Sequence, residues 1–185
     1  MSRSASIERN TKETDIRVAL ELDGTGQAEL DTGIGFFDHM LDGFARHGLF
    51  DLNVYVDGDL DVDCHHTVED TGIVLGNAIK EAVGDKKGIR RYGSCILPMD
   101  EALVLCAVDL SGRCTLNWDV HCKTEKVGDF DVECASEFWL GFARNVPATL
   151  HFVQFAGENT HHILEACFKG AGRALAEAVR IDAAH

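Results

Sequence analysis

The sequence predicts an α+β fold built from two similar halves, each a mainly antiparallel sheet with two helices packed on one face. Two observations support this prediction. A segment of the first half recurs in the second at an offset of 98 residues, LDGFARHGLFDLNV (41–54) against WLGFARNVPATLHF (139–152). A second pair follows in the same order at an offset of 96, HHTVEDTGIVLGNAIKEAV (65–83) against HHILEACFKGAGRALAEAV (161–179). Duplication of one supersecondary unit is the simplest explanation, with residues 1–92 and 93–185 as the two halves of one compact unit.

Each half is expected to contain several strands, a helix, a further strand or two, and a longer helix. Apolar residues that alternate with polar ones predict strands, as in residues 16–22 and 104–110. Near the end of the second recurring segment the apolar residues follow the helical period instead. They are Ile79, Ala82 and Val83 in the first half and Leu175, Ala178 and Val179 in the second. Such a stripe predicts a helix that packs on a sheet.

The composition excludes some classes of function. The formal net charge is −14 over 185 residues, which argues against nucleic acid or an anionic membrane surface as a partner. A polar N-terminus and the lack of a long apolar run predict a cytoplasmic protein. The seven cysteines are an odd number without CxxC spacing, so they are interpreted as reduced, mostly small core residues. The same spacing disfavours cysteine-ligated zinc and a redox pair.

Two HHxxE motifs indicate metal chemistry, because each falls where a long helix is expected to begin. His65 and Glu69 are four residues apart and share a helix face, so they can bind one ion. His66 is rotated by about 100°, so it cannot easily join them on that ion but can reach a second one. If the two motifs face each other across a pseudo-twofold axis, the two ligand sets are His65, Glu69 and His162, and His161, Glu165 and His66.

Isolated residues elsewhere fit the same site. His39 and His151 occupy non-equivalent places in the repeat and could each supply a fourth ligand. Imidazole and carboxylate without thiolate suit Mn²⁺, Fe²⁺ or Zn²⁺, and open octahedral positions favour manganese. Arg91, Arg113 and Lys169 would each be an ordinary exposed cation alone, but beside a metal site they could bind phosphate. His47, His121 and His185 have no such partners and are expected to be surface residues.

These motifs together make the chain resemble the imidazoleglycerol-phosphate dehydratase family over nearly its whole length. The resemblance is carried by RNTKETDI, TGIGFFDHML, HHTVED, KGIRRYG, MDEAL, DLSGR, TEKVGDF, TLHF and GENTHHILEACFK. It implies a 24-subunit shell with sites between subunits. It also implies a lyase of histidine biosynthesis that dehydrates D-erythro-imidazole-glycerol phosphate to imidazole-acetol phosphate, through an imidazolate bound by two Mn²⁺ ions.

The resemblance also implies roles for individual residues. The expected metal ligands are His39, His65, His66, Glu69, His151, His161, His162 and Glu165. Glu13 is similar to a family carboxylate with an acid–base role, and the expected substrate-binding residues are Glu13, Arg91, Arg113 and Lys169. The expected catalytic residues are Glu13, His39, His65, Glu69, His161 and Glu165.

Some departures from the family pattern leave alternatives open. Cys64 stands before the first HH pair, where Asp is usual, and the sequence ends at IDAAH without the usual Ser-x-Lys tail that closes over the phosphate. Weaker phosphate binding is therefore expected. One alternative is a shell of the same fold that is assembled by metal and impaired in catalysis. A dinuclear metallohydrolase or phosphatase would use the same ligand types, but the repeat and the lack of Asp-rich metal motifs argue against it.

Overall fold

The first half of the chain forms a four-stranded sheet and two helices. The computed structural model describes residues 2–182. The elements are β1 (Ser4–Asn10), β2 (Thr14–Glu21), β3 (Ala28–Asp31), α1 (Gly35–Gly48), β4 (Asp51–Gly58) and α2 (His65–Val83). The strand order is β1-β2-β4-β3, antiparallel except for the parallel pair β3 and β4.

The second half repeats this topology. Its elements are β5 (Tyr92–Met99), β6 (Ala102–Asp109), β7 (Thr115–Asp119), α3 (Cys134–Asn145), β10 (Thr149–Ala156) and α4 (Thr160–Val179). The order β5-β6-β10-β7, with β7 and β10 parallel, matches the first sheet strand for strand. A two-stranded hairpin, β8 (Lys126–Val127) and β9 (Phe130–Asp131), is inserted before α3. The predicted duplicated α+β fold is confirmed.

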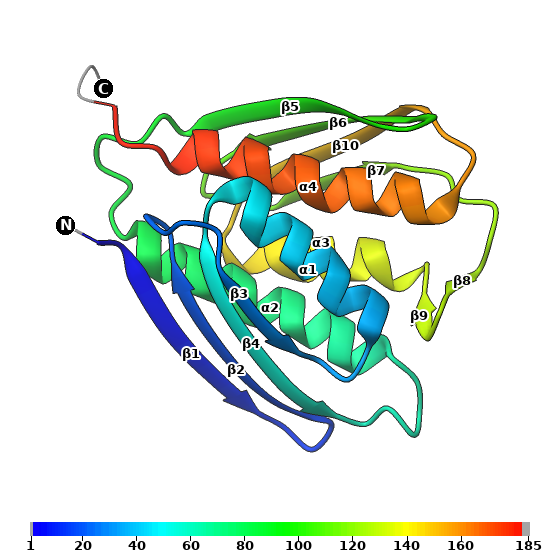
Figure 1. The fold of residues 1–185 in the computed structure, drawn as a ribbon. Coiled ribbons are helices and arrows are strands. Elements are labelled where there is room, and N and C mark those ends of the chain that lie inside the picture. Colours follow the sequence, from blue (N-terminus) through cyan, green and yellow to red (C-terminus); the bar gives the residue numbers. More distant parts are fainter. Residues whose placement is uncertain (1, 183–185) are drawn as a thin grey trace.

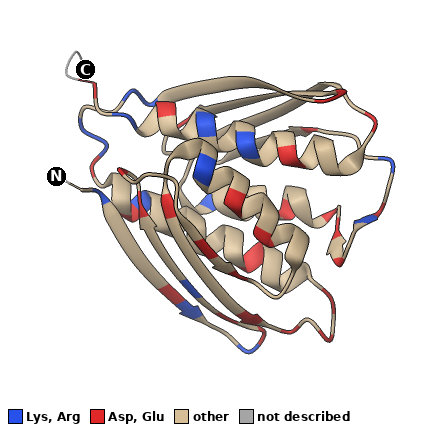
Figure 2. Cartoon of the chain, in the orientation of Figure 1, with Lys and Arg blue, Asp and Glu red and all other residues tan. Residues whose placement is uncertain are grey.

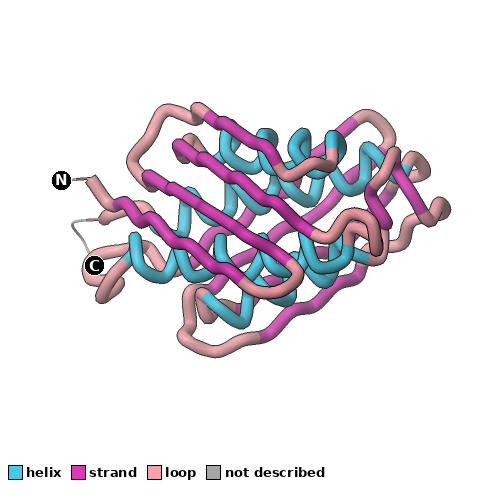
Figure 3. Tube along the Cα trace, turned by 90° about the horizontal axis from the view of Figure 1, so that it is seen from below, coloured by secondary structure: helices cyan, strands magenta, loops and turns pink. Residues whose placement is uncertain are grey.

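The four helices form a layer between the two sheets. In Figure 1 the second sheet lies above the helices and the first below, and in Figure 3 the first sheet crosses in front of them. α1 packs against α4, and α2 against α3, so each helix pair joins the two halves. A Cβ atom at Gly76 would lie 2.6 Å from the Phe142 carbonyl oxygen, and one at Gly172 would lie 2.4 Å from that of Phe44. Each helix pair therefore requires a glycine where the two backbones approach most closely. Among residues 2–182, no helix combines the length and apolar character needed to cross a bilayer.

Buried and exposed side chains alternate along the strands, so that one face of each sheet packs on the helix layer. Ile16, Val18 and Leu20 of β2 are each at most 3% exposed, and the residues between them point away from the helices. The seven cysteines are free thiols, as predicted, and four of them are buried, namely Cys64, Cys106, Cys134 and Cys167.

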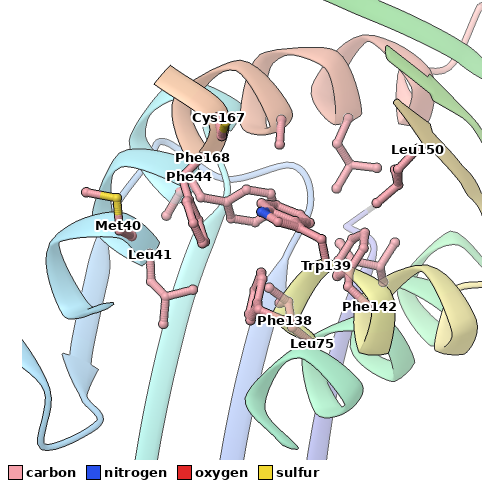
Figure 4. Packing of buried hydrophobic residues seen from close by; sticks show 14 of the residues in the cluster. Met40, Leu41, Phe44, Leu75, Phe138, Trp139, Phe142, Leu150, Cys167 and Phe168 are labelled. Atoms are coloured by element: carbon pink, nitrogen blue, oxygen red, sulfur yellow. The ribbon is translucent and has the colours of Figure 1, made fainter. Parts of the chain in front are cut away.

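The core is centred on Trp139 of α3 (Figure 4). Its ring lies 5.0 Å, centroid to centroid, from the rings of both Phe152 and Phe168, and 6.1 Å from that of Phe44. These partners come from β10, α4 and α1, so one side chain joins elements of both halves.

Replacing Trp139 with alanine is expected to lower the free energy of unfolding by about 3–5 kcal/mol, because a fully buried indole leaves a cavity that the rigid sheets cannot close. Urea denaturation of the metal-free protein measures this loss. Trp118→Ala is the control, since Trp118 is only partly buried against Phe152. Equal losses in the two variants would contradict the central role of Trp139.

Candidate metal and substrate site

All four helices begin at the same end of the molecule, at the right in Figure 1. Both HHxxE motifs lie there, because His65 is the first residue of α2 and His161 is the second residue of α4. Short side chains fix these helix starts. Asp63 accepts a hydrogen bond from the His65 backbone N–H at 2.9 Å, and Asn159 accepts one from that of His162 at 3.1 Å. The predicted position of the motifs at helix starts is confirmed.

The first group of donor atoms, here named the α1–α4 cluster, contains His39, His161 and Glu165. The His39 Nε2 lies 3.1 Å from Glu165 Oε1, and the His161 Nε2 lies 3.2 Å from Glu165 Oε2. Lys169 reaches the same carboxylate at 3.0 Å. Burial acts to raise the pKa of Glu165, but the hydrogen bond and charge of Lys169 and the two histidines together lower it. These contacts together favour the charged form of the Glu165 carboxylate.

The second group, the α2–α3 cluster, contains His65, Glu69 and Glu137. The His65 Nε2 lies 2.8 Å from Glu69 Oε2. Glu137, on α3, was not found by reasoning from the sequence, although a signal for it exists. At the offset of 98, Glu137 occupies the position that His39 occupies in the first half. The two clusters are thus related by the internal repeat, and each combines a short helix of one half with the long helix of the other.

The second histidine of each motif binds a carboxylate from a neighbouring loop. The Nδ1 of His66 lies 2.6 Å from Asp59, and that of His162 lies 2.5 Å from Glu101. These hydrogen bonds are the main reason that the pKa of each histidine is raised. The charge of Glu13, in the turn between β1 and β2, adds to the effect on His66. A carboxylate on Nδ1 fixes the direction of each ring, and the Nε2 of His162 also lies 3.4 Å from Asp100 Oδ2.

Neither of these second histidines joins the predicted ligand set within one chain. In the described part of a single chain, His162 is not grouped with His65 and Glu69, and His66 is not grouped with His161 and Glu165. Both second histidines are partly exposed and present their imidazoles at the molecular surface instead. Within the described part of one chain, each cluster therefore lacks the second histidine that was predicted to join it.

The predicted phosphate-binding arginines and His151 lie away from both clusters. The Arg91 N–H donates to the Ala178 carbonyl at 2.9 Å, near the last turn of α4. Ala178 is 17 residues beyond His161 on that helix, which corresponds to about 26 Å at about 1.5 Å per residue. Arg113 is exposed in the turn between β6 and β7. His151 is exposed on the outer face of β10.

Arg91 belongs to a basic stretch that is blue near the two termini in Figure 2. The stretch contains Lys86, Lys87, Arg90 and Arg91. The Arg91 guanidinium binds Asp109 at 2.7 Å and lies 5.0 Å from the ring of Tyr92, so it is held in a fixed direction. A held guanidinium is suited to binding a phosphate.

The histidines that were expected to be ordinary surface residues differ in how exposed they are. His121 is exposed beside Asp119, whereas His47 is partly buried and accepts a hydrogen bond from Arg173 at 3.2 Å. His185 lies outside the described residues.

Asp59→Asn is expected to weaken Mn²⁺ binding about 10–100-fold, because the amide cannot orient and polarise the His66 ring as a carboxylate does. Calorimetric titration of metal-free protein with Mn²⁺ measures the change. Asp61→Asn, at an exposed position of the same loop, is the control and should bind Mn²⁺ as the unaltered protein does. An unchanged affinity in Asp59→Asn would exclude this role.

The chain matches one known protein family over most of its length. Residues 32–175 match the family model described as imidazoleglycerol-phosphate dehydratase. A protein of that name from Citrifermentans bemidjiense is 58% identical over 183 residues, covering 99% of this chain and 94% of the relative. The one from Acetivibrio thermocellus is 56% identical over 182 residues, covering 98% and 93% respectively.

Solved structures give the same result. The crystal structure of imidazoleglycerol-phosphate dehydratase from Staphylococcus aureus has a TM-score of 0.87 and 37% identity, covering 96% of this chain and 99% of that one. The structure from Pyrococcus furiosus, in complex with (S)-C348, has a TM-score of 0.85 and 42% identity, covering 96% and 95%.

Proposed function

The chain belongs to the imidazoleglycerol-phosphate dehydratase family, and from this premise we propose that it dehydrates D-erythro-imidazole-glycerol phosphate to imidazole-acetol phosphate in histidine biosynthesis. The observation that supports this activity best is the repeated pair of His/Glu clusters at the helix starts. Their imidazole and carboxylate donors suit a divalent transition metal.

Two Mn²⁺ ions per active site are the proposed cofactors, and the residues present fit them. Each cluster contains three residues whose donor atoms lie close together, and both second histidines have a carboxylate on Nδ1. The proposed ligands are His39, His65, His66, Glu69, His151, His161, His162 and Glu165. When bound, the ions would supply positive charge beside the imidazole of the substrate and so stabilise negative charge that develops on it.

A homo-oligomer, a 24-subunit shell as in the resembling family, is part of the proposal. Arg91 lies beside the end of α4, about 26 Å from His161. This separation supports the oligomer, because Arg91 and the clusters of the same chain are too far apart to contact one small substrate molecule. In a shared site, His66, His151 and His162 would complete clusters of neighbouring subunits.

The remaining proposed residues act on the substrate directly. Arg91 and Arg113 would bind the phosphate, and Lys169, at 3.0 Å from Glu165, would do so beside the α1–α4 cluster. Glu13 is exposed in a turn near His66, with its N–H donating to Thr11 at 3.2 Å. Its carboxylate would take the proton from the carbon adjacent to the one that loses the hydroxyl, giving an enol that ketonises to the product, while the helix N-termini favour the anionic substrate.

The test is conversion of imidazole-glycerol phosphate by metal-stripped protein, with and without added Mn²⁺. Product that depends on Mn²⁺ supports the proposal. Metal-dependent assembly without dehydration would instead indicate a shell impaired in catalysis. Release of phosphate from generic monoesters would indicate a metallohydrolase and would overturn the proposal.

A further inference from the structure

A third group of metal-binding side chains lies apart from both histidine clusters and contains Cys64, Asp131 and Cys134. Cys64 directly precedes α2, Cys134 is the first residue of α3, and Asp131 lies on β9. The two sulfur atoms are 3.8 Å apart, and the Cys64 sulfur lies 3.4 Å from the Asp131 Oδ2. Three donors from three segments therefore meet next to His65.

These distances match the ligand shell of a tetrahedral zinc ion. With Zn–S bonds of about 2.3 Å and a Zn–O bond of about 2.0 Å, the sulfurs of such a site are about 3.8 Å apart, and a sulfur and the oxygen are about 3.5 Å apart. In the protein, the two sulfurs are 3.8 Å apart and the Cys64 sulfur is 3.4 Å from the Asp131 oxygen, close to both of these values. An ion could bind with little movement of the two helices.

Another buried cysteine pair shows how thiols in this core behave without a carboxylate. Cys106 donates to the backbone carbonyl of Cys167 at 3.5 Å, and both side chains are at most 1% exposed. Cys64 and Cys134 differ in facing a carboxylate, which is also 3.5 Å from the Lys126 ammonium. A carboxylate beside two thiols is a feature of a binding site for a cation more than of an apolar core.

The group can be reached from solvent through Asp131. This side chain lines a groove of about 550 Å³ together with Cys122, Lys126 and Glu133. The carboxylate extends from the groove to Cys64, whose side chain is otherwise buried. An ion could therefore enter along Asp131 and displace Lys126.

We propose that Cys64, Cys134 and Asp131 form a separate binding site for Zn²⁺. The bound ion would join the start of α2 to the start of α3, and so would hold His65 and Glu137 in place. This site does not depend on the proposed dehydratase activity, and binding can be measured without substrate.

Cobalt is the probe, because thiolate ligands give Co²⁺ a charge-transfer band in the near ultraviolet that imidazole and carboxylate ligands do not give. Reduced, metal-free, full-length protein is titrated with Co²⁺. The band is expected to reach the intensity of one thiolate-bound Co²⁺ per chain, whatever amount the two histidine clusters bind, and to disappear when Zn²⁺ is added. Cys64→Ser and Cys134→Ser should lose the band, whereas Cys106→Ser, at a matched buried cysteine, should retain it.

Asp131→Asn keeps both thiols in place and provides a test if the serine variants fail to fold. It should raise the Co²⁺ concentration needed for half saturation while leaving the band. Absence of the band in the unaltered reduced protein, or its persistence in both folded serine variants, would overturn the proposal.

Discussion

His161→Ala is expected to lower kcat/KM for dehydration by at least about a thousandfold, because a metal ion that stabilises developing charge contributes several kcal/mol. His161 shares Glu165 with His39, so its loss leaves the α1–α4 cluster with one imidazole. The variant should also bind fewer Mn²⁺ ions per chain. Steady-state kinetics and elemental analysis of the dialysed protein measure the two effects together.

The control for this variant is His121→Ala. His121 is exposed beside Asp119 on the second sheet and belongs to neither cluster, so activity and metal content should remain unchanged. The α1–α4 cluster would lose its proposed role if His161→Ala kept its metal and its turnover. Loss of metal with full turnover would separate metal binding from catalysis and contradict the proposed role of the metal in dehydration.

The sequence predicted much of the fold because the duplication is visible in it. Two aligned segments, together with alternating strands such as residues 16–22, were enough to predict two equivalent α+β halves. The exchange of helix partners between the halves could not be predicted in the same way. The contact of α1 with α4 and of α2 with α3 depends on the packing of whole surfaces, such as the close approach of Gly172 to Phe44.

The sequence predicted those contacts of the site that lie within a single helix. The i and i+4 spacing placed His65 with Glu69 and His161 with Glu165, and the structure has both pairs. The spacing carried no information on Glu137, which comes from another helix. It could be found only by applying the 98-residue offset to His39.

The partners of the second histidines illustrate another limit. Asp59 and Glu101 lie in loops, and no periodic pattern connects them with His66 or His162. The thiol pair shows the same limit, since the spacing of Cys64 and Cys134 disfavours a metal site although the fold brings their sulfurs to 3.8 Å. Side chains that meet through loop conformation are invisible to sequence periodicity.

Glu13→Gln is expected to lower kcat by about 10²–10⁴-fold, the usual contribution of a positioned general acid or base. The amide keeps the size of the side chain and its place in the turn, but it cannot take a proton. Because Glu13 is exposed and belongs to neither cluster, the variant should bind Mn²⁺ in the normal amount. A loss of kcat with unchanged metal content would separate the proton-transfer role from a role in metal binding.

Glu8→Gln is the matched control, because Glu8 is also an exposed carboxylate of the first sheet, within β1, and contacts Arg17 at 4.0 Å. Its kcat should equal that of the unaltered protein, since its charge does not lie near His66. If Glu13→Gln kept full turnover, another group would have to move the proton. If the variant lost Mn²⁺ along with turnover, the negative charge of Glu13 near His66 would be needed for metal binding instead. That charge already helps to raise the pKa of His66, after the larger effect of Asp59.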